Sequence, residues 1–204
     1  MKSKFAPIAI TLAAIFAGLA VASVWWGPRP VTLQSGSLLT PPRPLPDFAP
    51  LTADDGQPFT RASLDGHWTL LFPGYTYCPD VCPTTLAMLN ALATAQAKTG
   101  QPVQVIFLSV DPARDTPERL RVYVHAFNPQ FTGVTAQEPT LAAFAKIFGI
   151  AYAKADGGTP DHYTMDHTTT LILIDSQARI AAYFTPPFQL QTLQADLRAV
   201  LSGR

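Results

Sequence analysis

The sequence contains little cysteine and has no formal net charge. Cys78 and Cys82 are the only cysteines among 204 residues, and three residues separate them. A structural disulfide framework usually scatters its cysteines so that the bridges close long loops, which this pair cannot do. The 14 basic and 14 acidic side chains cancel, so no excess positive charge favours a phosphate backbone as partner. We therefore expect neither a disulfide-stapled domain nor a nucleic-acid-binding protein.

The longest stretch without charge lies at the N-terminus. It runs for 23 residues from Phe5 to Gly27, and a helix of about 20 apolar residues spans a bilayer. Lys2 and Lys4 precede the run, and basic residues favour the cytoplasmic side of a membrane. We predict an N-terminal transmembrane anchor over residues 1–27, with the rest of the chain outside the cytoplasm.

A cleaved secretory signal is the alternative for the same stretch. The small residues Ala20-Val21-Ala22 before Ser23 satisfy the rule for a cleavage site, although the apolar run is longer than that of a usual signal. Both interpretations export the domain. Because no Arg- and Ser-rich transit peptide comes first, we expect a single-pass protein of the bacterial cell membrane whose soluble domain faces the periplasm.

The segment that follows is rich in proline. Residues 28–46 hold six prolines and show no helical periodicity, which is typical of a stiff, extended linker. Hydrophobic residues make up 48% of the chain, enough for one sizeable core. We expect that core in a single folded domain over residues 47–204.

The pattern of this domain alternates between strands and helices. Buried strands are predicted over 68–72 and 103–110, which are apolar runs, and the helix formers of 83–97 predict a helix between them. Turn residues predict a short hairpin or turn pair over 52–65. Helices are further expected over 116–127, 138–148 and 189–201, and a closing hairpin over 169–174 and 179–184. This order predicts an α/β, thioredoxin-like fold.

The two cysteines follow the first predicted central strand and stand at the start of a helix. Ligands of open α/β sheets bind beyond the carboxyl ends of the strands. A helix N-terminus lowers the pKa of a thiol and favours thiolate, the form that binds metals and attacks disulfides. Enzymes of dithiol exchange usually carry Cys-X-X-Cys, one residue shorter than the spacing here. The two cysteines could therefore serve either metal binding or thiol-disulfide exchange, and their spacing favours metal binding.

A third ligand would have to be a histidine. His125 falls in a predicted helix and His67 in a turn, so both are expected to be ordinary surface or partly buried residues. His162 and His167 share one predicted loop, and His167 adjoins the strand after it. His167 is therefore the candidate ligand, with a satisfied polar residue as the alternative.

The chemistry of these donors narrows the choice of metal. Two thiolates and one imidazole form a soft site with few ligands, which suits Cu(I) and tolerates Cu(II). Structural zinc normally has a fourth ligand, for which Asp80 or Asp166 is the candidate. Copper is thus favoured, with zinc as a minor alternative.

Three segments in the same order resemble the Sco/SenC family, the copper chaperones of cytochrome c oxidase assembly. They are 74–83 (GYTYCPDVCP), 109–117 (SVDPARDTP) and 163–168 (YTMDHT). Met165 stands where the family commonly has Val, a conservative change. The resemblance covers about residues 46–201, and the predicted anchor also matches the family's usual layout.

The resemblance implies a thioredoxin fold in which Cys78, Cys82 and His167 bind one copper ion. The protein would deliver copper to the dinuclear centre in cytochrome c oxidase subunit II, or reduce the cysteines of that centre. Another periplasmic copper chaperone or a thiol reductant would be a further partner. A metallochaperone is not an enzyme; the enzymatic alternative is a thiol-disulfide oxidoreductase in which Cys78 attacks and Cys82 resolves. A peroxidase is a third, weaker alternative, because its reactive cysteine usually lies in another motif without this histidine.

Asp111, Arg114 and Asp115 follow the second predicted central strand, near the edge of the site. We expect them to be mainly structural, with the two carboxylates capping the next helix. The alternative is a direct role in docking a partner.

Overall fold

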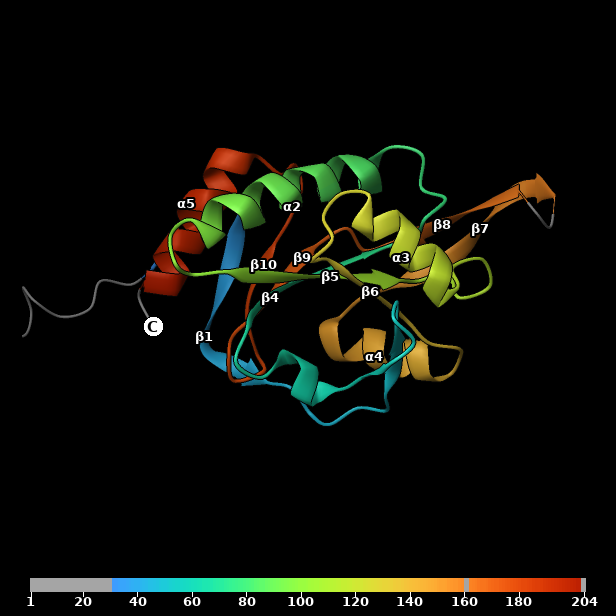
Figure 1. The fold of residues 1–204 in the computed structure, drawn as a ribbon, viewed down its shortest axis with the longest axis horizontal. Coiled ribbons are helices and arrows are strands. Elements are labelled where there is room, and N and C mark those ends of the chain that lie inside the picture. Colours follow the sequence, from blue (N-terminus) through green and yellow to red (C-terminus); the bar gives the residue numbers. More distant parts are fainter. Residues whose placement is uncertain (1–30, 160–161, 203–204) are drawn as a thin grey trace, which may run out of the picture. The chain divides into compact units, whose positions relative to one another are not determined.

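The computed structural model describes residues 31–159 and 162–202 (Figure 1). The predicted anchor over residues 1–27 lies outside them. Within the described ranges, no helix combines the length and the apolar character needed to cross a membrane.

An eight-stranded mixed sheet forms the centre of the domain, in the order β1-β10-β9-β4-β5-β6-β2-β3. Strands β4, β5 and β6 run parallel to one another, and β9 pairs antiparallel with β4. The strands are β1 (Gly36–Pro44), β2 (Leu51–Ala53), β3 (Pro58–Phe59), β4 (Trp68–Gly74), β5 (Val103–Ser109), β6 (Thr132–Thr135), β9 (Leu171–Ile174) and β10 (Arg179–Phe184). This is the α/β class that the sequence predicts.

Helices cover both faces of the sheet. They are α2 (Val81–Ala97), α3 (Pro117–His125), α4 (Thr140–Phe148) and α5 (Leu190–Ser202), with a short 3₁₀ helix over Arg61–Leu64. Helices α2, α3 and α5 lie on one face and α4 on the other (Figure 1). Because both faces are covered, β4 and β5 are buried along nearly their whole length. That burial explains the continuous apolar runs that predicted these strands.

The helices confirm the sequence predictions closely, with one useful difference. Helix α2 begins at Val81 rather than at the predicted residue 83. Cys82 therefore lies in the first helical turn instead of in the loop before it.

Strand β1 differs from the expectation of a free linker over residues 28–46. Its residues 36–44 are extended, as the prolines suggest, but they pair antiparallel with β10, from Gly36 opposite Phe184 to Pro44 opposite Arg179. Proline is tolerated here because β1 is an edge strand. A Cβ atom on Gly36 would come within 2.3 Å of the Tyr183 carbonyl oxygen, so only glycine allows this close approach. The division into anchor, linker and domain stays a prediction.

A second, two-stranded sheet was not expected. Strand β7 (Tyr152–Thr159) pairs antiparallel with β8 (His162–His167), and we call this unit the histidine hairpin. The prediction that His162 and His167 lie in a loop was wrong, because both belong to β8. The segment is polar and rich in glycine, so its local pattern indicates a loop, and only pairing between the two strands makes it a hairpin.

Candidate metal centre

The cysteine loop, residues 75–82, joins the end of β4 to the first turn of α2. Cys78 is half-buried and Cys82 fully buried, and both are free thiols. The backbone N–H of Cys82 donates to the Cys78 sulfur over 3.4 Å. An amide of the first turn of α2 is thus directed at the Cys78 sulfur.

The Cys82 sulfur packs against the sheet. A Cβ atom on Gly74 would lie 2.9 Å from this sulfur and 2.5 Å from Cε2 of Phe107, so the end of β4 has no room for a side chain. Burial raises the pKa of the Cys82 thiol, and the neighbouring Cys78 raises it further. The expectation that the helix N-terminus lowers thiol pKa values is therefore wrong for Cys82, because loss of solvent disfavours its thiolate more strongly.

His167 is the last residue of β8 and lies opposite Tyr152 in the hairpin. Its Nδ1 atom is 2.8 Å from the Thr168 carbonyl oxygen. A carbonyl can only accept, so Nδ1 carries the hydrogen and Nε2 keeps a free lone pair. Burial lowers the pKa of His167. The residue is thus a neutral imidazole with one nitrogen available as a ligand, held as metal-binding histidines usually are.

Tyr75 connects the cysteine loop with the histidine hairpin. Its ring stands perpendicular to the His167 ring, with 5.9 Å between the centroids. Burial raises the pKa of the Tyr75 hydroxyl, and a backbone hydrogen bond from Met165 on β8 lowers it in part. The nearby Cys78 and Cys82 raise the same pKa through their negative charge when ionised. The structure therefore brings the two cysteines and the histidine to one region around Tyr75.

These three side chains lie near one another but do not form an assembled metal site. In the described part of the chain, no group of three His, Cys, Asp or Glu side chains is close enough to hold a metal ion as it stands. The carboxylates considered for zinc are exposed; Asp80 accepts a hydrogen bond from Thr84, and Asp166 lies on the outer side of β8.

The remaining histidines lie elsewhere. His67 is exposed, and His162 is at the start of β8, five residues before His167. His125 lies on α3 with Nε2 3.3 Å from the Asp54 carboxylate. His125 and His67 thus show no link to the cysteine loop, as expected from the sequence.

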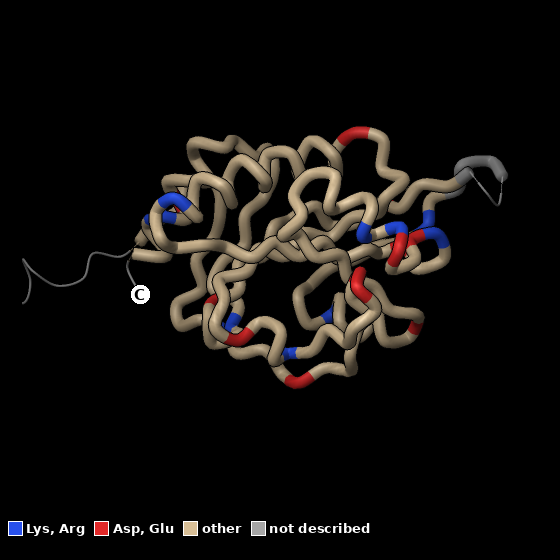
Figure 2. The backbone as a smooth tube through the Cα atoms, viewed as in Figure 1, with Lys and Arg blue, Asp and Glu red and all other residues tan. Residues whose placement is uncertain are grey.

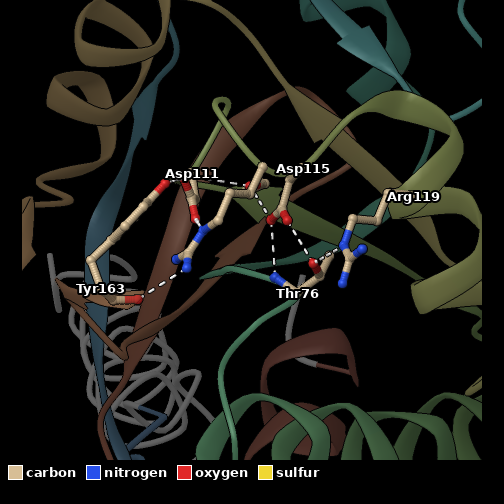
Figure 3. Close-up of polar contacts among 7 residues, drawn as sticks. Thr76, Asp111, Asp115, Arg119 and Tyr163 are labelled. Carbon is tan, nitrogen blue, oxygen red and sulfur yellow. Dashed lines mark hydrogen bonds and ion pairs between the residues drawn. The ribbon is translucent and has the colours of Figure 1, made fainter. Parts of the chain in front are cut away.

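A buried carboxylate holds the cysteine loop in place. Asp115 accepts hydrogen bonds from the Thr76 backbone N–H (2.9 Å), the Thr76 hydroxyl (2.6 Å) and the Ser109 hydroxyl (2.6 Å) (Figure 3). Burial raises the pKa of Asp115, and these hydrogen bonds lower it in part. The expectation that Asp115 caps the next helix is wrong. Thr116 is the cap, and its side chain accepts from the N–H of Arg119.

Asp111 is not a helix cap either. Its carboxylate accepts from the Tyr163 hydroxyl over 2.7 Å and lies 2.5 Å from Nε of Arg114. Thr76 and Tyr163 were not among the predicted site residues, because their partners lie 39 and 52 residues away along the chain. The signals in the sequence were the place of Thr76 in the first resembling segment, beside the cysteines, and the place of Tyr163 in the third.

Charged residues are sparse in this domain. Figure 2 shows positions of both signs interspersed along the backbone where α3 and the histidine hairpin lie. The ion pair of Arg114 with Asp111 is one of these mixed contacts.

Comparison with known proteins agrees with this architecture. The SCO1/SenC family pattern matches residues 44–202. The structure of Arabidopsis thaliana ScoI with copper bound is similar with a TM-score of 0.74 and 28% identity, covering 78% of this chain and 99% of that one. Bradyrhizobium japonicum ScoI with copper bound gives 0.67 and 35%, covering 76% and 98%. The apo Sco1 protein of Thermus thermophilus gives 0.71 and 36%, covering 81% and 95%.

The family match spans most of the chain, and these similarities extend over nearly the whole length of each solved domain. The predicted fold is confirmed at the level of a mixed α/β, thioredoxin-like Sco domain. The chain belongs to the SCO1/SenC family.

Proposed function

We propose that this protein is a copper metallochaperone that binds one copper ion through Cys78, Cys82 and His167. The observation that carries the proposal is the state of His167, a neutral imidazole with a lone pair on Nε2, in contact with Tyr75, which both free thiols also influence. Similarity to two Sco structures with copper bound, one of them 35% identical, supports the choice of metal.

The donor set fits copper as a cargo. Two sulfurs and one nitrogen suit Cu(I), which accepts few, soft ligands, and they also serve Cu(II). Zinc would need a fourth ligand. The two candidates, Asp80 and Asp166, are both exposed to solvent, which disfavours them as ligands of a closed zinc site. Because Cys78 is half-buried while Cys82 is fully buried, Cys78 is the ligand that an incoming thiol of another protein reaches first.

The proposed recipient is the dinuclear copper centre in cytochrome c oxidase subunit II. This assignment rests on the resemblance of the three segments to chaperones of oxidase assembly. Transfer would proceed by ligand exchange between the chain's thiolates and the recipient's cysteines. We further propose that the N-terminal segment anchors the chain in the bacterial cell membrane, that the domain faces the periplasm, and that a periplasmic copper donor or thiol reductant serves it.

The test is copper titration of the full-length chain beside Cys78→Ala, Cys82→Ala and His167→Ala. We expect one copper per chain, with stable binding lost in all three variants and only weak residual binding by the two thiols left in His167→Ala. His125→Ala is the matched control, because His125 contacts Asp54 on a different element. Copper binding that survives His167→Ala unchanged would refute the ligand assignment.

A thiol-disulfide oxidoreductase is the second candidate, favoured by the different exposure of the two cysteines. The Cys78 thiolate would attack a partner disulfide, form a mixed disulfide and release one partner thiol. The Cys82 thiolate would then displace the second thiol, leaving a Cys78–Cys82 disulfide and a reduced partner. This function predicts that His167→Ala keeps its exchange activity, whereas the chaperone predicts loss of copper in the same variant.

A further inference from the structure

We propose that Arg114, together with Asp111 and Tyr163, positions the histidine hairpin against the cysteine loop and thereby sets where His167 lies. We call these three residues the clasp. The part of this inference that concerns copper rests on the proposed function, whereas the part that concerns the hairpin does not.

The clasp is a closed ring of three polar contacts. Arg114 Nε lies 2.5 Å from the Asp111 carboxylate, and Nη1 donates to the Tyr163 carbonyl oxygen over 3.0 Å. The Tyr163 hydroxyl donates back to Asp111 over 2.7 Å (Figure 3). Asp111 is almost fully buried, and the Arg114 side chain is only 15% exposed. Little water competes for these contacts, so they are stronger than ion pairs at the surface.

The Arg114 guanidinium also lies between the two halves of the site. It is 3.5 Å from the ring centroid of Tyr163 on the hairpin. It is also 4.5 Å from the ring centroid of Tyr77 and 5.8 Å from that of Tyr75, both in the cysteine loop. A cation against aromatic faces is attractive, more so when it is shielded from solvent. One side chain therefore joins the segments that carry the thiols and the imidazole.

The hairpin depends on such contacts for its position. In the described ranges β7 and β8 pair with each other and with no strand of the eight-stranded sheet. Backbone hydrogen bonds thus fix the shape of the hairpin but not its distance from the cysteine loop. The short connection from His167 to β9 limits that distance, and side-chain contacts of Tyr75 and the clasp help to set it.

Strand geometry carries the effect of the clasp to His167. Tyr163, Met165 and His167 alternate with exposed residues along β8, so they share one face of the strand. Met165 packs against the hydrophobic core on this face. Fixing Tyr163 at one end of the face therefore fixes the orientation of His167 at the other.

Two residues of the clasp, Asp111 and Arg114, belong to a five-residue segment that also holds the cysteine loop. Asp111 and Arg114 contact the hairpin, while Asp115 binds the backbone and side chain of Thr76. Residues 111–115 thus set both halves of the site from one side. Asp111 and Asp115 are both buried and have different roles: Asp111 contacts the hairpin, and Asp115 holds the cysteine loop.

The test compares Arg114→Met with Arg119→Met in the full-length chain. Arg119 is the matched control. Its guanidinium also lies over the Tyr77 ring, 4.1 Å from the centroid, and its Nε donates to the Thr76 hydroxyl. Among the described residues, Arg119 makes no hydrogen bond to the histidine hairpin. We expect Arg114→Met to weaken copper binding about tenfold, as loss of an outer partner of a metal ligand does. Arg119→Met should change it less than threefold.

A double-mutant cycle with His167→Ala separates positioning from general damage. If the clasp acts through His167, Arg114→Met should cause no further loss of affinity once His167→Ala is present. An equal loss in both backgrounds would overturn the proposal. Arg114→Lys, which keeps the charge but not the planar fork, should restore only part of the affinity.

Hydrogen exchange of the metal-free chain tests the clasp without copper. We expect Arg114→Met to speed exchange of the β8 amides about tenfold while the β4 and β5 amides keep their rates. Tyr163→Phe, which removes a single hydroxyl, serves if Arg114→Met does not fold, and should act in the same direction. Unchanged β8 exchange in Arg114→Met would refute the clasp. If β8 exchange speeds up as expected but the chain binds no copper, only the proposed function would be refuted.

Discussion

The cysteine loop and the histidine hairpin supply donors to one candidate site, yet they are built in different ways. The loop continues β4, which has β9 and β5 as neighbours, and its residues Tyr75 and Cys82 are buried. The hairpin is a sheet of its own, with alternate residues of β8 exposed. The Cys82 thiol is therefore part of the domain core and Cys78 lies half-buried beside it, whereas the imidazole belongs to a separate hairpin that packs on the core through side chains such as Met165.

This difference bears on how a cargo metal could be held and released. Displacing Cys82 would disturb packing against the sheet, since its sulfur lies beside the end of β4. Moving His167 would leave the eight-stranded sheet intact, because the hairpin pairs with none of its strands in the described ranges. It would disturb the contacts of Tyr75, of the clasp and of Met165 with the core. We infer that the hairpin is the half of the site that can adjust when a ligand is gained or lost.

The largest effect is expected from Gly74→Ala on the cysteine side. The new methyl group would lie 2.5 Å from Phe107 and 2.9 Å from the Cys82 sulfur, so the core has to shift. We expect the free energy of unfolding to fall by about 2–3 kcal/mol, measured by urea denaturation. Thr164→Ala, on the exposed side of the hairpin, should change it by less than about 0.5 kcal/mol. Equal costs would show that the two regions do not differ in packing.

Thr76→Val tests the polar support of the same loop. The substitution keeps the shape of the side chain but removes the hydroxyl that donates to buried Asp115 and accepts from Arg119. We expect a loss of about 2 kcal/mol in unfolding free energy, typical of a hydrogen bond to a charged group.

Thr94→Val is the control for Thr76→Val, because Thr94 is exposed on α2, and it should cost less than about 0.5 kcal/mol. Unfolding curves of the two variants that overlap would mean that Asp115 does not support the loop through Thr76.

The pH dependence of copper binding distinguishes the two kinds of donor. Burial raises the pKa of Cys82, so its thiol is protonated at neutral pH and copper has to displace that proton. Burial lowers the pKa of His167, so its imidazole is already neutral above its ordinary value of 6.5. Affinity should therefore rise with pH, at least about tenfold per unit between pH 6.5 and 8, and His167→Ala should keep this slope. A competition titration showing flat affinity would argue against Cys82 as a ligand.

The same contrast explains what the sequence could predict. Strands β4 and β5 and helix α2 carry strong local patterns, an apolar run or a series of helix formers, so their existence and the placement of Cys78 and Cys82 followed from residues close in the chain. The hairpin has no such pattern, because its strands are stable through pairing and through contacts with distant residues. The role of His167 as a ligand stays a prediction, while its strand, the partners of Tyr163 and the contacts of Asp115 required the tertiary structure.

The smallest effect is expected from Tyr75→Phe, which alters the junction of the two regions without touching a proposed ligand. The variant keeps the ring that lies against His167 and loses the hydroxyl that interacts with the Met165 backbone. One hydrogen bond is worth about 1 kcal/mol, which corresponds to a fivefold change in a local opening equilibrium. We expect the β8 amides to exchange about fivefold faster, while amides of α2 and the midpoint of urea unfolding hardly change. If exchange in α2 rises as much as in β8, the loop and the hairpin open together, and the hairpin is not the separately adjustable half of the site.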